Sequence, residues 1–151
     1  MTPPYPKDLF PATRAHEGVW EGTYTHLNAA AEVEDRHRSR VVCEFPDDGG
    51  PVFYRQHIRF EWEDGRVRED VFEGAPRAGR LWYDTPTFSG SSWETHDGLI
   101  LLNLARKDEP GANFFEVIAM GEGGRRRART WHWFRDGALY RRTLCDEARI
   151  G

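Results

Sequence analysis

The chain is divided into short runs in which hydrophobic and polar residues alternate, separated by segments rich in glycine, proline and aspartate. Alternation with a period of two is typical of a strand that buries one face. A helical turn is expected only around Pro11-Ala12-Thr13-Arg14. The predicted strands span residues 18–27, 36–45, 52–62, 66–73, 80–84, 88–96, 98–106, 113–120, 125–135 and 138–146.

The segments between these runs have the composition of hairpin turns. Asp-Gly occurs at 48–49, 64–65, 97–98 and 136–137, and this pair favours tight turns between antiparallel strands. Consecutive short strands joined in this way indicate an up-and-down meander, and closure into a barrel removes its exposed edges. The sequence therefore predicts an all-β antiparallel barrel of about eight to ten strands. A β-sandwich is the alternative.

The length of 151 residues suits one domain, expected as a leader over 1–15 followed by a barrel over 16–147. With 38% hydrophobic and 30% charged residues, the composition is that of a globular protein. No apolar run approaches the roughly 20 residues that span a bilayer, and the first residues lack the pattern of a signal peptide. We therefore expect a cytoplasmic protein without a membrane partner, in which Cys43 and Cys145 are free thiols.

The net charge of −4 argues against nucleic acid as a partner, because nucleic-acid binding usually needs a basic face. Only Lys7 and Lys107 are lysine among the 21 basic residues. This excess of arginine has two explanations, a GC-rich bacterial genome or the recognition of carboxylate or phosphate groups by guanidinium. Composition fits both. A homodimer is compatible with the sequence but not indicated by it.

The alternation also assigns inner faces to the strands. In 66–73, Val67 and Val71 favour an inner face that they share with Glu69. In 125–135 both faces carry aromatic residues, and the even-numbered set with His132 is preferred inside because it is smaller. In two further runs the inner set is clear: Ser39, Val41, Cys43 and Phe45, with His37 at the rim, and Tyr54, Gln56, Ile58, Phe60 and Trp62.

These assignments place a polar subset among aromatic side chains inside the barrel. Small-molecule pockets are mostly apolar with a few placed polar groups, so we expect a cavity that binds a small hydrophobic or aromatic ligand with a polar or anionic group. A filled core with a satisfied polar network, serving as an interaction module, is an alternative. The expected ligand-binding residues are Tyr24, His26, His37, Tyr54, Gln56, Glu69, His132 and Trp133.

A second alternative is a reaction in the same cavity. Glu69, His132 and Tyr24 are candidates for acid–base catalysis in a cofactor-free isomerase, cyclase or lyase. No standard catalytic motif supports it, and the six histidines are isolated along the chain. Since metal ligands usually recur at close spacing, neither a metal nor a cofactor is expected.

The start of the first predicted strand, Gly18-Val19-Trp20, resembles the Gly-x-Trp entry of lipocalin-like (calycin) barrels. The resemblance implies that Trp20 plugs one end of the barrel and that an arginine of the last strand, Arg141 or Arg142, lies over the indole.

Gly18-Val19-Trp20-Glu21-Gly22-Thr23-Tyr24, followed by Asp35-Arg36-His37-Arg38-Ser39, is further similar to the opening of the bacterial DUF3598 family, which is distantly similar to phycobiliprotein lyases. That resemblance implies a small hydrophobic ligand such as a pigment or a fatty-acid-like compound. The segment 18–22 also resembles the nitrobindin-type haem barrels. Haem is nevertheless not expected, because no histidine follows His132 where that family has its proximal ligand.

Overall fold

The computed structural model describes residues 5–151; residues 1–4 of the predicted leader lie outside the described part. A short helix precedes ten strands, and a single 3-10 turn at Glu122–Gly124 connects the eighth and ninth. The elements are α1 (Pro11–Arg14), β1 (Gly18–Asn28), β2 (Val33–Glu44), β3 (Tyr54–Glu61), β4 (Val67–Arg77), β5 (Arg80–Asp84), β6 (Phe88–Glu94), β7 (Ile100–Arg106), β8 (Ala112–Gly121), β9 (Arg126–Arg135) and β10 (Ala138–Arg149).

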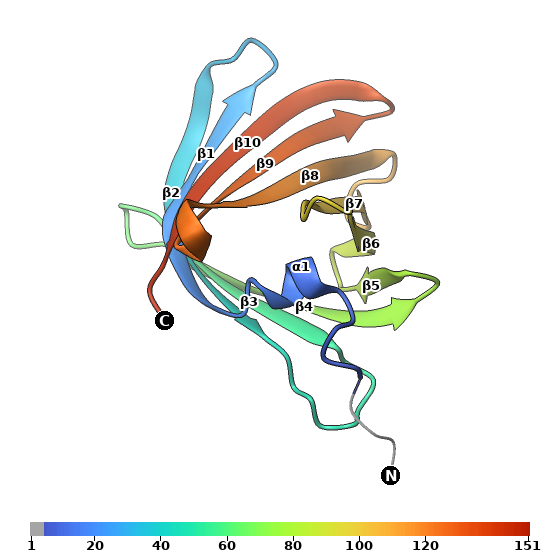
Figure 1. Cartoon of the computed structure of the whole chain (residues 1–151). Coiled ribbons are helices and arrows are strands. Elements are labelled where there is room, and N and C mark those ends of the chain that lie inside the picture. Colours follow the sequence, from blue (N-terminus) through green and yellow to red (C-terminus); the bar gives the residue numbers. More distant parts are fainter. Residues whose placement is uncertain (1–4) are drawn as a thin grey trace.

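The strands form a closed barrel in which each strand pairs antiparallel with its neighbours in the chain (Figure 1). β1 completes the ring by pairing with β10, in a register that places Trp20 opposite Arg149 and Asn28 opposite Arg141. The predicted all-β up-and-down barrel and the helical turn at Pro11–Arg14 are thus confirmed.

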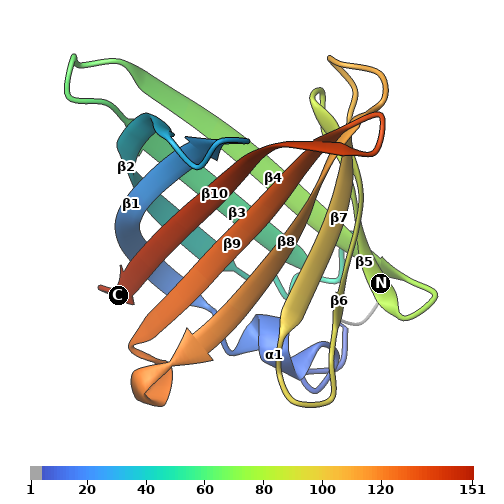
Figure 2. The same ribbon diagram turned by 90° about the horizontal axis from the view of Figure 1, so that it is seen from above.

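The two ends of the barrel differ. Figure 2 shows α1 at one end, while the β1–β2 and β9–β10 connections lie at the other. The Glu94 carboxylate holds α1 in place because it accepts hydrogen bonds from the backbone N–H groups of Ala12 and Thr13, at 3.0 and 2.6 Å, and from the Thr13 hydroxyl at 2.7 Å. α1 therefore covers one end and leaves the other without a helix.

Trp20 lies in the core at the covered end and is fully buried. Its indole Nε1 donates to the backbone oxygen of His16 at 2.9 Å. The guanidinium carbons of Arg127 and Arg149 lie 4.6 and 4.4 Å from the ring centroid, a cation–π arrangement. Gly18 enters the strand at φ +133°, where a Cβ would come within 2.5 Å of the Gly151 oxygen, so this entry requires glycine.

The prediction that Arg141 or Arg142 covers Trp20 is wrong. β10 extends to Arg149 and runs antiparallel to β1, so that its last residues, not its first, lie beside the start of β1. Arg141 instead pairs with Glu34 at 3.1 Å, near the far end of β1, and Arg142 is opposite His132 in β9.

The predicted inner faces of β2 and β3 agree with the structure. Val41, Cys43, Ile58 and Phe60 are all buried, and His37 is only 5% exposed.

The predicted face of β4 is reversed. Val67, Glu69 and Val71 are exposed, and Glu69 lies 3.7 Å from Arg59 and 3.8 Å from His57 on the outer surface. Arg68 and Asp70 lie opposite inward-facing residues of β3 and share their face.

The preferred face of β9 is wrong as well. His132 is exposed and stacks on Phe134, whereas the odd-numbered set, Arg127, Arg129, Trp131 and Trp133, points inward. Arg127 and Arg129 can be buried because glutamates of β8 and β10 form ion pairs with them. Their ion pairs are Arg127 to Glu147 at 2.7 Å and Arg129 to Glu116 at 2.9 Å.

Candidate functional site: a cavity in the barrel

The barrel contains a cavity of about 390 Å³. Its lining includes Thr87 and Asp108, which lie in the β5–β6 and β7–β8 connections at the end away from α1. The cavity therefore faces the end that α1 does not cover, and it lies in the size range of small-molecule pockets. A barrel completely filled by side chains, one of the alternatives from the sequence, does not describe this interior.

One wall of the cavity is a continuous row of aromatic rings from four strands. The ring centroids of Phe72 and Phe88 are 6.0 Å apart, those of Phe88 and Phe114 are 5.4 Å apart, and those of Phe114 and Trp133 are 4.8 Å apart. Rings at these separations present faces and edges on which another planar group can pack.

The inner end of the cavity is polar and fully buried. The Arg129 guanidinium donates to the Tyr24 hydroxyl at 2.9 Å and to Glu116 at 2.9 Å, and it lies 3.6 Å from Glu147. Burial opposes the charge of Arg129, but Tyr24 and these carboxylates hold its pKa above the ordinary value. Arg129 and the two carboxylates thus form a buried ion-pair network that borders the cavity.

Tyr24 is neutral in this setting. Burial raises the pKa of its phenol well above the usual value, although Arg129 opposes the shift. Its oxygen accepts the hydrogen bond from Arg129, so its own O–H remains available as a donor. Burial also raises the pKa of Glu116, against the opposing effect of Arg129.

Three more arginines surround the mouth. Arg68 approaches Asp70 at 3.3 Å, Arg106 approaches Asp108 at 2.8 Å, and Arg141 pairs with Glu34. Each guanidinium has five N–H donors. Arg68 uses Nη2 toward Asp70 and lies over the Phe60 ring at 4.5 Å, so other donors of this side chain can reach an anion at the entrance.

Five of the eight predicted ligand-binding residues line the cavity, namely Tyr24, His26, Tyr54, Gln56 and Trp133. His37 lies next to them, with its ring centroid 5.3 Å from that of His26. Glu69 and His132 are on the outside of the barrel, so among the three candidates for acid–base catalysis only Tyr24 reaches the cavity.

Sequence reasoning missed the charged residues of the interior, Arg129 and Glu116 above all. The signal for Glu116 was present, because it alternates with Phe114 and Ile118 in β8 and must share their inward face. The structure also brings His26, Asp35 and His37 together as possible metal ligands.

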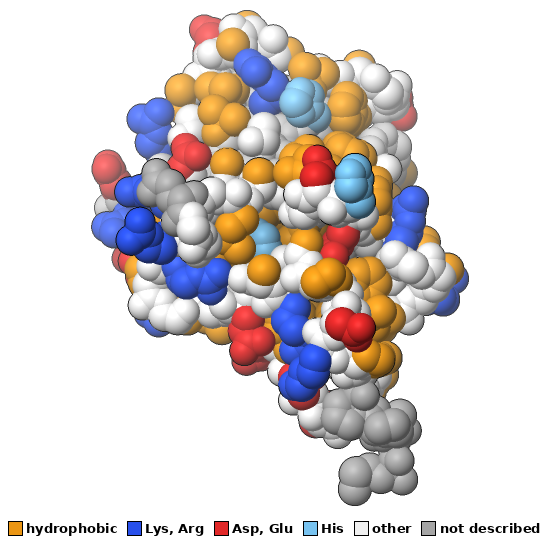
Figure 3. All heavy atoms as spheres, in the orientation of Figure 1, with side chains coloured by type: hydrophobic (Ala, Val, Ile, Leu, Met, Phe, Trp, Pro, Cys, Tyr) orange, Lys and Arg blue, Asp and Glu red, His pale blue; other side chains and the backbone are white. Residues whose placement is uncertain are grey.

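The outer surface in the view of Figure 3 shows acidic, basic and hydrophobic side chains interspersed, without one dominant patch of a single charge. Among the described residues, no helix has the length and apolarity needed to cross a membrane.

Neither a family model nor a curated protein matches the sequence. Among solved structures, the fold is similar to that of a protein of unknown function from the DUF3598 family of Nostoc punctiforme PCC 73102, with a TM-score of 0.72 and 17% identity. The match covers 91% of this chain and 49% of that one, so the chain spans about half of its length.

A second similar structure is that of EF1p2_mFAP2b bound to DFHBI. Its TM-score is 0.52 at 12% identity, and the match covers 95% of this chain and 100% of that one. At these identities the likeness concerns the fold. The chain therefore has the lipocalin-like barrel fold that the DUF3598 structure also has.

Proposed function

We propose that the protein binds a small, planar aromatic molecule with an anionic group inside its barrel. The observation that carries this proposal is the cavity of about 390 Å³, which is lined both by a row of aromatic rings and by several arginines. The rings of Phe88, Phe114 and Trp133 offer packing surface. Arg68 and Arg106 at the mouth supply guanidinium donors, whereas Arg129 at the inner end is paired with Glu116 in a buried polar network.

The similar barrel EF1p2_mFAP2b holds the ligand DFHBI in its solved structure. A barrel of this fold can therefore accommodate a small molecule, which makes ligand binding a reasonable role for the cavity of this chain. A bacterial, cytoplasmic setting is part of the same proposal. It agrees with two buried cysteines, Cys43 and Cys145, that are both free thiols.

The experiment uses 8-anilinonaphthalene-1-sulfonate, a fluorescent aromatic anion, as the probe. We expect saturable binding of one probe per chain to the wild type. Phe88→Leu removes one ring from the wall and should raise the Kd about 2- to 10-fold, the equivalent of the roughly 0.5–1.5 kcal/mol that an aromatic contact contributes beyond its area.

Phe115→Leu is the matched control. Phe115 is also half-buried but packs against Trp93, at a centroid distance of 5.9 Å, on the outer side of the same sheet region. This variant should bind the probe as the wild type does. Equal affinities for all three proteins would contradict binding in the cavity.

A further inference from the structure

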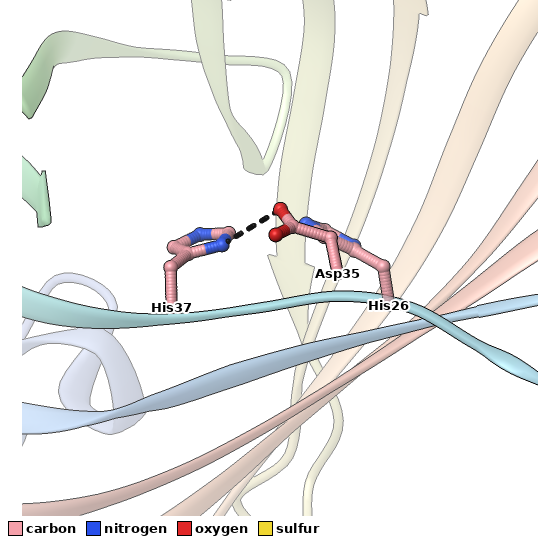
Figure 4. A group of neighbouring side chains, drawn as sticks. All are labelled: His26, Asp35 and His37. Carbon is pink, nitrogen blue, oxygen red and sulfur yellow. Dashed lines mark hydrogen bonds and ion pairs between the residues drawn. The ribbon is translucent and has the colours of Figure 1, made fainter. Parts of the chain in front are cut away.

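Three potential metal ligands meet beside the mouth of the cavity. His26 comes from β1, and Asp35 and His37 come from the paired strand β2 (Figure 4). Each offers one ligand atom, and these atoms all lie within 4.8 Å of one another. The Nδ1 of His37 is 3.1 Å from Asp35 Oδ2. The pair is hydrogen-bonded, and its two atoms lie slightly closer together than the about 3.4 Å between two ligands of one tetrahedral Zn²⁺ ion.

The outer hydrogen bonds of the cluster orient its ligands. Trp62 Nε1 donates to both oxygens of Asp35 at 3.1 Å. His26 Nδ1 lies 2.6 Å from the Thr143 hydroxyl, which also accepts a hydrogen bond from Trp133 Nε1 at 2.8 Å. An oxygen with two lone pairs can accept from both nitrogens. The tautomer with a proton on Nδ1 leaves His26 Nε2 free to bind a metal, as is usual for ligating histidines.

His37 is buried with only one of its ring nitrogens partnered. Nδ1 faces Asp35, while Nε2 has no hydrogen-bond partner among the described residues, although the side chain is 95% inaccessible to solvent. Such unpartnered buried groups are uncommon in folded proteins, and an ion or a water molecule that binds there is one explanation for them. The ring is also fixed from the side, because Trp62 lies over it at a centroid distance of 4.3 Å.

The three side chains supply two imidazole nitrogens and one carboxylate oxygen to the cluster. The nearby Arg68 and Arg141 are paired with Asp70 and Glu34.

We propose that His26, Asp35 and His37 form a binding site for a divalent transition-metal ion such as Zn²⁺. Two imidazole nitrogens select such ions over Mg²⁺ and Ca²⁺, which prefer oxygen ligands. The three ligand atoms lie within 4.8 Å of one another, so a small approach of the side chains is required for all three to bind one ion. Three protein ligands leave a fourth position open, and because His26 also lines the cavity, a bound molecule can reach that position.

The test is Zn²⁺ titration calorimetry on the full chain after treatment with a chelator, without any aromatic ligand, so that its outcome is independent of the proposed function. We expect one Zn²⁺ per chain with a Kd in the micromolar range or below. His37→Gln and Asp35→Asn should each raise the Kd at least tenfold. His57→Gln is the control, because His57 and Glu69 form an exposed histidine–carboxylate pair at 3.8 Å on the outer surface. The affinity of this variant for Zn²⁺ should equal that of the wild type.

A second measurement does not depend on the folding of variants. Addition of Co²⁺ to the wild type should produce visible absorption bands of a low-coordinate site, and Zn²⁺ should abolish them. Imidazole ¹⁵N resonances of His26 and His37, but not that of His57, should shift on Zn²⁺ addition. Absence of stoichiometric binding, or binding that shifts neither His26 nor His37, would overturn the proposal.

Discussion

Trp20 shows how a single side chain connects the covered end of the barrel to the strands around it. Its indole N–H is bonded to the segment after α1, and its ring is flanked by arginines from β9 and β10. The residue thus links the N-terminal segment, the first strand and the last two strands. The position of Trp20 followed from the Gly-x-Trp pattern. Its partner Arg149 depended on the length and direction of β10, and its partner Arg127 depended on which face of β9 points inward.

Trp20→Ala is expected to lower the free energy of unfolding by about 3–5 kcal/mol, the usual cost of truncating a buried tryptophan. Urea denaturation measures this value. Trp82→Ala is the control, because Trp82 packs against Arg77 on the outer surface and its loss should cost under about 1 kcal/mol. A loss below about 1 kcal/mol for Trp20→Ala would contradict the role of this residue in the core.

Among the elements, α1 depends on tertiary contacts because four residues are too few to form a stable helix alone. Glu94 at the end of β6 supplies three hydrogen bonds to it. Glu94→Ala is expected to cost about 2–3 kcal/mol, since hydrogen bonds to a charged group contribute about 1.5–3 kcal/mol. Faster hydrogen exchange at the Ala12 and Thr13 amides would identify the loss as local.

Glu21→Ala removes an exposed glutamate of β1 and is the control for this experiment. In this variant, hydrogen exchange at the Ala12 and Thr13 amides should match that of the wild type. Unchanged exchange in Glu94→Ala as well would show that the carboxylate does not hold the helix.

The strands also show where alternation is sufficient and where it is not. In β2 and β3 hydrophobic residues mark the inner face because they pack in the closed part of the core. β4 borders the open mouth, where Arg68 and Asp70 stay close to water, so polarity no longer distinguishes inside from outside. In β9 the inward arginines are neutralised by Glu116 and Glu147 of other strands, and such pairing across strands is not visible in one strand's sequence.

The same limit explains the metal-ligand cluster. His26 and His37 are separated along the chain and become neighbours through the pairing of β1 with β2. The approximate positions of the strands, their order and the closed barrel could be predicted because turn residues and period-two runs are local signals, although β4 and β10 extend beyond their predicted ends at 73 and 146. Ligand sets assembled from several strands require the register, which depends on turn geometry as well as on the hydrophobic pattern.

For the molecule as a whole, the barrel has a covered end stabilised by buried polar contacts and an open end that holds the cavity. His16 belongs to the covered end, where it lies 2% exposed beneath α1 and its Nδ1 accepts a hydrogen bond from Arg127 Nη1 at 3.2 Å. Burial, together with the charge of Arg127, lowers its pKa from 6.5 to about 3. The folded state therefore keeps this imidazole neutral at pH values where the unfolded chain protonates it.

This difference makes the global stability pH-dependent. His16 contributes stability that is fully present above pH 6.5 and is lost progressively as the pH falls toward about 3, because only the unfolded state takes up the proton in that window. Between pH 7 and pH 5 the expected loss from this one group is about 2 kcal/mol. His16→Gln keeps an acceptor for Arg127 but has no titratable group at this position. Between pH 7 and pH 5, the unfolding free energy of this variant should therefore fall by about 2 kcal/mol less than that of the wild type.

His96→Gln is the control, because it changes an exposed histidine, and it should retain the wild-type pH dependence. Parallel pH profiles for the wild type and His16→Gln would show that His16 is protonated equally in the folded and unfolded chains.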